Sequence, residues 1–207
     1  MSKLLYIEAS PRKDRSTSIR IAREFLDAYR AAHPGDTVDK LDLWAEELPP
    51  FDGETINAKY AVLHGQPHPP AQAAAWARVT AIADRFKSAD KYLFSLPMWN
   101  FGVPYKLKHY IDVITQPGLT FTFSPAEGYK GLVTGKPAVV IYARGGEYQA
   151  GGASYDFQKP YLELLLGFIG FTNISAIVAE PTLGAPEAAE KSKAAAIDLA
   201  RQMASRF

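Results

Sequence analysis

The sequence predicts a doubly wound α/β fold, in which a parallel five-stranded sheet carries helices on both faces. Short apolar runs alternate along the whole chain with segments whose apolar residues recur at helical spacing. Because the short runs are apolar at every position, they are typical of strands buried on both faces. The chain has 207 residues, 47% of them hydrophobic, which suits one domain spanning 1–207.

The first part of the chain predicts two strands and one helix. The apolar run at 4–7 ends before Pro11, as expected of a short buried strand. Apolar residues from 19 to 29 then lie on one helical face, with hydroxyl N-cap candidates before them and Pro34 after them. Val38, Leu41 and Leu43 mark a second, weaker strand.

The next segment, 45–71, contains three proline clusters and a helix-like stretch at 55–64, and we interpret it as an insertion between core elements. Trp76, Val79, Ala83 and Phe86 recur at helical spacing and predict a helix that ends near Ser88. The remaining predicted elements are a strand over 92–96, a helix that has Pro104 in its first turn and runs to Ile114, a small hairpin at 121–123, a strand over 138–142, a helix over 161–168, a strand over 174–178 and a final Ala-rich helix over 187–205.

Five buried strands separated by helices leave few arrangements once right-handed crossovers are required. The flavodoxin-like strand order 2-1-3-4-5 suits five strands. In such a sheet, ligands bind beyond the carboxyl ends of the strands, at the switch point between strands 1 and 3. The segments that follow Ile7, Leu96 and Tyr142 are therefore the places to look for a site.

Composition excludes several classes of function. Lys plus Arg total 23 and Asp plus Glu total 22, so the net charge of +1 offers no field that attracts nucleic acid or an anionic membrane. There is no cysteine, which excludes a disulfide scaffold, a thiolate metal site and a cysteine nucleophile. Apolar stretches are too short for a membrane helix, and we expect a cytoplasmic protein. The four histidines form no metal-ligand spacing, so no metal site is predicted.

A hydroxyl-rich turn follows the first strand, at Ala9–Ser18. Free backbone N–H groups at a helix start, together with hydroxyls, can enclose a phosphate. The turn lacks the glycines of a dinucleotide site and the Gly-Lys-Ser/Thr of a triphosphate loop, so a monophosphate fits best. The alternative is that Ser16 or Ser18 only caps the helix.

Two more strand ends carry ligand-like features. Pro97–Pro104 contains Met, Trp, Asn and Phe, which could line a planar ring or equally close over the core. Gly145 and Gly146 would let a ligand approach the backbone, or could form a tight turn. Because all three segments end neighbouring strands, a phosphate pocket, a ring platform and a glycine turn together describe flavin mononucleotide (FMN).

The order and spacing of these motifs resemble the FMN-dependent NADH:quinone oxidoreductase and azoreductase family over essentially the whole chain. The resemblance implies a flavodoxin-like homodimer with an FMN near the interface in each subunit. It also implies ping-pong transfer of two electrons from NADH to quinones or azo compounds. The segments that carry it are Leu5–Arg12, Ser16–Ser18, Pro97–Phe101, Pro104–Asp112, Arg144–Gly146, Phe157–Leu162 and Leu166–Gly170.

The resemblance also assigns residues. Trp99 stands where the family commonly has Tyr, and Ala143 where it has Ser, so Ala143 contributes only its backbone. No side chain is assigned as a catalytic acid or base, and Phe121, Phe123 and Phe157 are candidate walls of a substrate slot. The implied cofactor contacts are Ser10, Ser16, Thr17 and Ser18 at the phosphate, Met98, Trp99, Asn100 and Phe101 beside the ring, and Ala143, Arg144, Gly145 and Gly146 at its edge.

Three alternatives remain open at this point. One is a flavodoxin-type electron carrier without an activity of its own, although such carriers are usually smaller and strongly acidic. A second is a phosphate-handling hydrolase that uses the serine-rich turn, and a third is a tetrameric quinone reductase with different loops. No residue distinguishes NADH from NADPH, and the resemblance favours NADH.

Overall fold

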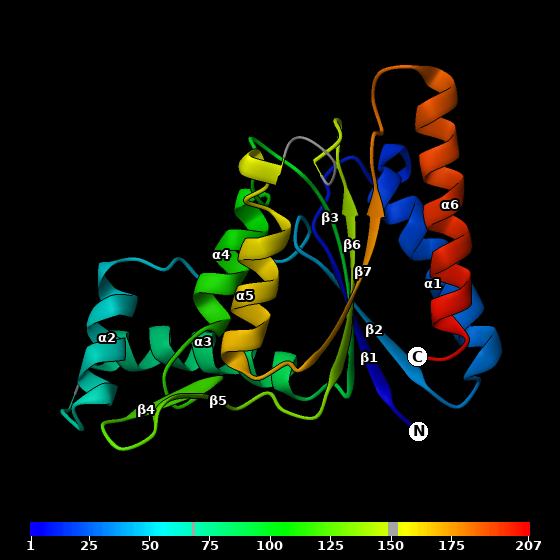
Figure 1. Cartoon of the computed structure of the whole chain (residues 1–207). Helices are drawn as coiled ribbons and strands as arrows, with labels where there is room; N and C mark the ends of the chain where they lie inside the picture. Colours follow the sequence, from blue (N-terminus) through cyan, green and yellow to red (C-terminus); the bar gives the residue numbers. More distant parts are fainter. Residues whose placement is uncertain (68, 149–152) are drawn as a thin grey trace.

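The computed structural model describes residues 1–67, 69–148 and 153–207, and its central element is a five-stranded parallel sheet (Figure 1). The strands are β1 (Lys3–Glu8), β2 (Thr37–Asp42), β3 (Lys91–Pro97), β6 (Pro137–Ala143) and β7 (Asn173–Ala179). They pair in the order β2-β1-β3-β6-β7, which is 2-1-3-4-5 in chain order. The predicted fold class is confirmed, and β1 and β3 meet at the switch point.

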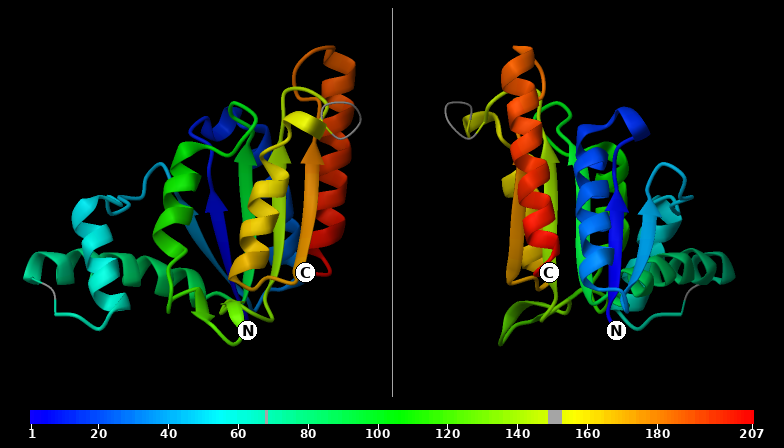
Figure 2. Two further views of the ribbon diagram at one scale, coloured as in Figure 1. Left: turned by 60° about the vertical axis from the view of Figure 1, so that its left-hand side comes forward. Right: turned by 90° about the vertical axis from the view of Figure 1, so that its right-hand side faces the viewer.

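Helices cover both faces of this sheet (Figures 1 and 2). On one face lie α1 (Thr17–Ala32) and α6 (Pro186–Ala204), and on the other α3 (Pro70–Lys87), α4 (Tyr105–Ile114) and α5 (Lys159–Ile169). The helix α2 (Gly53–Leu63) lies against α3, away from the sheet (Figure 2, left). No helix in the described part of the chain is long and apolar enough to cross a membrane.

The side chains of β1 alternate between two hydrophobic cores. Leu5 and Ile7 are fully buried against the α3, α4 and α5 layer. Leu4 and Tyr6 face α1 and α6 and are buried on that side. This alternation is the two-sided burial that the uninterrupted apolar run predicts. Both cores together hold the carboxyl ends of the strands in fixed register.

The helix α3 begins earlier than its apolar pattern predicts. Its first residue is Pro70, which suits the first helical turn, whereas the apolar spacing is detectable only from Trp76 onward. The intervening Ala71–Ala75 segment is alanine-rich and helix-favouring, but its small residues give no hydrophobic periodicity. The predicted insertion thus contains α2 and the start of α3. Pro104 is likewise the N-cap of α4 rather than part of its first turn.

The predicted hairpin is present as β4 (Phe121–Ser124) and β5 (Gly128–Gly131). A Cβ atom on Gly131 would overlap the backbone of Gly170, so the glycine permits the close approach of the hairpin to the end of α5. The Phe121 and Phe168 rings lie 4.8 Å apart. Figure 1 places the hairpin at the end of the molecule opposite the carboxyl ends of the strands.

An acidic side chain ties the start of the chain to the amino-terminal end of the sheet. The Tyr29 hydroxyl donates to Asp36 at 2.6 Å, the backbone N–H of Ser2 donates at 2.6 Å, and the Lys91 ammonium lies 3.3 Å away. The hydrogen bond from Tyr29, followed by those from Ser2 and Lys91, holds the pKa of Asp36 well below its usual value. A lowered pKa means that the charged carboxylate stabilises the fold.

We expect Asp36→Asn to lower the melting temperature at neutral pH. The contribution of the carboxylate is present above its ordinary pKa of about 4 and is lost as the pH falls further. The difference in melting temperature between wild type and variant should therefore shrink as the pH is lowered from 6 toward acid. Thermal melts over that pH series provide the measurement, and a constant difference would contradict this role.

Candidate functional site

The carboxyl ends of β1, β3 and β6 meet at one edge of the sheet, as the strand order requires. A cavity of about 150 Å³ lies there, between the turn after β1, the loop after β3 and the loop after β6. It includes seven of the predicted residues and adds two from the loop after β7. The lining residues are Ser10, Arg12, Ser16, Thr17, Pro97, Met98, Trp99, Ala143, Gly145, Thr182 and Leu183.

The hydroxyl turn forms the first wall of this cavity. Ser10, Ser16 and Ser18 are all nearly or fully buried, and the Ser16 and Ser18 hydroxyl oxygens are 3.2 Å apart. Ser16 is the N-cap of α1, because its hydroxyl accepts a long 3.5 Å hydrogen bond from the backbone N–H of Ile19. The capping alternative thus applies to Ser16. Ser18 does not line the cavity itself but contacts Ser16 behind it.

The chemistry of this wall fits a phosphate group. Hydroxyls are donors to anionic oxygens, and the first N–H groups of an α-helix have no partner within the helix. Here the start of α1 and the hydroxyls of Ser10, Ser16 and Thr17 line one small space. Arg12 adds a positive charge at its rim. The arrangement offers several donors to a dianion and no carboxylate among its lining residues.

The loop after β3 forms the second wall and is held in a strained turn. Met98 donates its backbone N–H to the Ala143 oxygen at 2.9 Å, which fixes it to the end of β6. Trp99 and Gly102 exchange backbone hydrogen bonds of 3.0 and 2.9 Å. Between them, Asn100 and Phe101 adopt left-handed φ values of 46° and 69°. Such a conformation in non-glycine residues costs energy and is often found at functional sites.

The turn separates its four predicted residues. Met98 and Trp99 line the cavity, whereas Asn100 and Phe101 lie at the tip of the turn, and Phe101 is 47% exposed. The Phe101 carbonyl accepts a 3.0 Å hydrogen bond from the backbone of Phe157. Of the predicted slot walls, Phe157 is therefore beside this turn. Phe121 and Phe123 lie on the distant hairpin of the same subunit.

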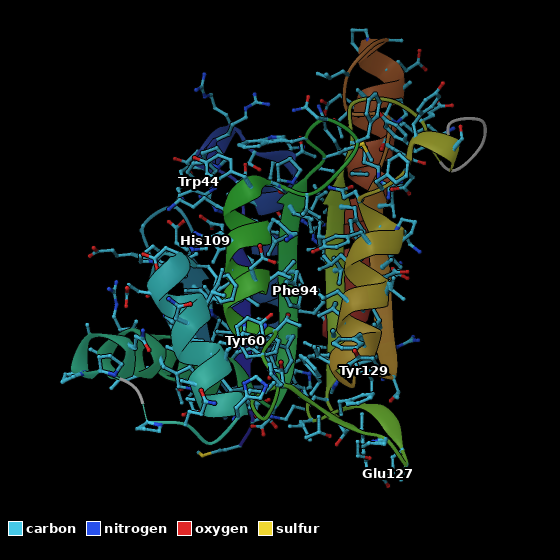
Figure 3. The ribbon with its side chains drawn as sticks, turned by 90° about the vertical axis from the view of Figure 1, so that its left-hand side faces the viewer. Trp44, Tyr60, Phe94, His109, Glu127 and Tyr129 are labelled. Atoms are coloured by element: carbon cyan, nitrogen blue, oxygen red, sulfur yellow. The ribbon has the colours of Figure 1, made fainter. Side chains whose placement is uncertain are left out.

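A second tryptophan, which the sequence reasoning missed, buttresses this wall. Trp44 follows β2, and its indole N–H donates to the Ala9 carbonyl at 3.1 Å. Its ring lies 5.8 Å from the Trp99 ring and 5.4 Å from the Tyr105 ring. Figure 3 shows Trp44 at the same end of the molecule as the strand ends, above His109. The available signal was a large aromatic residue directly after a strand.

The loop after β6 forms the third wall. A Cβ atom on Gly145 would lie 3.1 Å from a methyl group of Leu183, so glycine keeps this approach open. The Leu183 N–H in turn donates to the Gly145 oxygen at 3.1 Å. Gly146 lies beside Tyr148 instead and does not line the cavity. Ala143 lines it at the strand end.

Arg144 differs from its expected placement, because its side chain does not face the cavity. It is fully buried behind the loop, 2.8 Å from Asp156 and 3.2 Å from Glu180. Ala143 is the last residue of β6, and the backbone N–H of Arg144 continues the pairing with β7 by donating to the Ala179 carbonyl at 3.0 Å. The side-chain alternation of a strand therefore extends to this pair. That alternation explains why the alanine lines the cavity and the arginine does not.

Within the described part of the chain, no group of three or more histidine or acidic side chains could hold a metal ion. His109 is engaged by the carbonyl of Pro49, at 2.8 Å. His68 lies outside the described residues, as do residues 149–152 of the loop after β6.

The strand order and the cavity at the switch point define a flavodoxin-like protein. Residues 2–203 match the family model described as "Flavodoxin-like fold". Proteins named FMN-dependent NADH:quinone oxidoreductase are similar to this chain over nearly its whole length. That of Desulfotalea psychrophila is 54% identical over 98% of both chains, and that of Nitratidesulfovibrio vulgaris is 51% identical over the full length of both. The chain belongs to the flavodoxin-like family of FMN-dependent NADH:quinone oxidoreductases.

Solved structures agree with this assignment. An azoreductase from Bacillus anthracis superposes with a TM-score of 0.93 at 34% identity, with both chains fully covered. An FMN-dependent NADH-azoreductase from the same species, solved in complex with FMN, superposes with a TM-score of 0.86 at 28% identity, covering 99% of this chain and all of the other.

Proposed function

We propose that the protein is an FMN-dependent oxidoreductase that transfers two electrons from NADH to quinones and also reduces azo compounds. The observation that carries the proposal is the buried hydroxyl pocket beside a strained aromatic loop at the switch point, in a chain 54% identical to a named relative. Full-length relatives named as oxidoreductases support an enzyme rather than an electron carrier or a phosphate-handling hydrolase.

In this proposal each wall of the cavity has one task. Ser10, Ser16 and Thr17 donate to the phosphate, with Ser18 supporting Ser16 from behind. Met98 and Trp99 lie along the ring, and the Gly145 backbone lies at its edge. When bound, FMN supplies the hydride chemistry, so the protein needs only to bind, orient and exclude water. No side chain of this cavity is assigned as a proton donor.

Four of the predicted cofactor residues do not line the cavity, and in this proposal they support the loops that do. They are Asn100, Phe101, Arg144 and Gly146. The left-handed turn at Asn100 and Phe101 sets the direction of Met98 and Trp99. Gly146 and the backbone of Arg144 continue the loop that carries Gly145. Direct contact of these residues with the ring stays a prediction, which a structure of the FMN complex would test.

We expect the protein to bind one FMN per subunit and to prefer FMN to FAD. The hydroxyl pocket accommodates one terminal phosphate and lacks the glycines that a pyrophosphate requires. Chromatography of the flavin released from purified protein measures this directly. Mainly FAD, or no flavin after incubation with FMN, would contradict the proposal.

Steady-state oxidation of NADH with a quinone should give the parallel reciprocal plots of a ping-pong mechanism.

We further propose a homodimer that completes the site. Large apolar side chains are exposed on α4, on α5, on the hairpin and on the loops that precede the two helices, and we call this surface the aromatic face. A hollow of about 630 Å³ between Phe51, Tyr105 and Phe157 belongs to it. Contiguous exposed apolar patches on a monomer commonly mark interfaces. Its exposed residues are Phe101, Tyr105, Phe123, Tyr129, Tyr155, Phe157 and Leu164.

Two-fold symmetry would give the hairpin a role at the site. Figure 3 shows Glu127 and Tyr129 at one end of the molecule and Trp44 at the other. If two aromatic faces meet in antiparallel orientation, the hairpin of one subunit approaches the strand ends of its partner. Phe123 would then reach the substrate slot that it cannot reach in its own subunit. A tetramer would need a second interface, and sedimentation distinguishes a dimer from a tetramer.

We also propose that the protein is cytoplasmic, and cell fractionation tests this location.

A further inference from the structure

Arg144 is a buried charge at the edge of the candidate site. Its side chain has no solvent exposure, and its guanidinium lies among acidic and amide groups. One nitrogen lies 2.8 Å from Asp156, another 3.2 Å from Glu180, and Nε donates to the Gln158 side chain at 3.1 Å. Taking a charge out of water is costly even when it is paired, and removing one partner of a buried pair is strongly destabilising.

The partners of Arg144 come from separate segments that the arginine joins. Asp156 stands at the entry to α5, where its other oxygen accepts 3.0 Å hydrogen bonds from the backbones of Gln158 and Lys159. Glu180 follows β7 and accepts from the Tyr148 backbone at 3.2 Å. We call Arg144, Asp156, Gln158 and Glu180 the arginine cluster. It connects the ends of β6 and β7 to the start of α5.

Each of these segments supports one side of the cavity. Directly after Asp156, the Phe157 N–H donates to the Phe101 carbonyl at 3.0 Å and so restrains the turn that carries Met98 and Trp99. On the other side, Thr182 donates from its backbone and its hydroxyl to the Arg144 carbonyl, both at 2.8 Å. Thr182 and its neighbour Leu183 line the cavity. The arginine cluster therefore lies behind both the second wall, formed by the loop after β3, and the loop after β7.

We propose that Arg144 is a positioning residue, which with Asp156 sets the spacing of the two cavity walls without touching the ligand. The inference rests on the proposed function of the cavity. The spacing that this ion pair sets matters because a displacement of about 1 Å at a reacting centre can cost up to about a hundredfold in rate. A structural ion pair without this role would affect only the stability of the fold.

The decisive variant is Asp156→Asn. The asparagine oxygen can still accept the two backbone hydrogen bonds at the start of α5, whereas its amide group faces the guanidinium with a donor. The variant thus breaks the ion pair between Arg144 and Asp156 and retains the hydrogen bonds at the start of α5. We expect the KM for the quinone to rise and kcat/KM to fall about tenfold. The visible circular dichroism of the bound flavin should change, while the Kd for FMN stays within about threefold, because the hydroxyl pocket is unaltered.

A matched control is Asp39→Asn, which breaks an arginine–carboxylate pair of 2.9 Å between Asp39 and Arg85, away from the strand ends. It should lower the melting temperature but leave the KM and the flavin dichroism unchanged. Gln158→Met removes the acceptor of the Arg144 Nε without changing charge, and it should shift both readouts in the same direction by a smaller factor. This second variant decides the matter if Asp156→Asn does not fold.

The inference is overturned if the folded variants keep the wild-type dichroism and a KM within about twofold, or if Asp39→Asn changes both to the same extent. Failure of the proposed function is a separate outcome, since it would appear as wild-type protein that binds no FMN or does not oxidise NADH.

Discussion

Replacing Ser10 and Ser18 together by alanine is expected to weaken FMN binding by about tenfold or more. The hydrogen bond from the Ser10 hydroxyl to the charged phosphate contributes roughly 1–3 kcal/mol, and the loss of Ser18 removes the contact that supports Ser16. Ser10 lines the cavity, and Ser18 contacts the cavity-lining Ser16 from a fully buried position. Titration of the apoprotein with FMN, followed by flavin fluorescence, measures the change.

The stability of the apoprotein distinguishes binding from capping. In the folded chain the capping hydroxyl is that of Ser16, so the double variant at Ser10 and Ser18 should melt close to the wild type. Ser16→Ala is the matched comparison and should lose about 1 kcal/mol of apoprotein stability in addition to its effect on FMN. If the double variant keeps its FMN affinity but unfolds earlier, these serines are structural and the assignment of the phosphate pocket is wrong.

Phe123→Glu is expected to dissociate the proposed dimer and to reduce activity per bound flavin by about tenfold or more. Phe123 is 58% exposed on the hairpin, within the aromatic face, and a carboxylate there would have to be desolvated in the interface. The loss of activity would follow because the open slot no longer excludes water and the partner's hairpin no longer covers it. Sedimentation over a dilution series, with NADH:quinone activity measured in parallel, tests both effects.

Leu199→Glu serves as the control for this variant. Leu199 is a 40% exposed apolar residue on α6, on the other face of the sheet, so a charge there should change neither assembly nor activity. Full activity per flavin in demonstrably monomeric Phe123→Glu would rule out a shared site, even if the protein is dimeric in the wild type.

The sheet and the general place of the site could be predicted from sequence because both depend on local patterns. A run that is apolar throughout, as in Leu4–Ile7, has few environments other than a strand covered on both faces. Once the strand order is fixed, the carboxyl ends of β1, β3 and β6 must be adjacent. That adjacency brings Ser10, Met98 and Gly145 into one cavity although they are far apart in the chain.

The finer assignments depend on tertiary geometry that no local pattern carries. Which of Ala143 and Arg144 faces the cavity is decided by the register of β6 at its last residue. Thr182 and Leu183 were missed because they follow β7, the edge strand of the sheet, which does not border the switch point between β1 and β3. Trp44 was missed because it lies between a weak strand and a proline-rich segment, where an aromatic residue gives no periodic signal.

The most direct test of the central claim is an anaerobic titration of the FMN-loaded protein with NADH, followed by addition of a quinone. The account predicts that one equivalent of NADH per subunit bleaches the visible flavin absorbance and that one equivalent of quinone restores it. Bound FMN that NADH does not bleach, or bleached protein that the quinone does not reoxidise, would contradict the account.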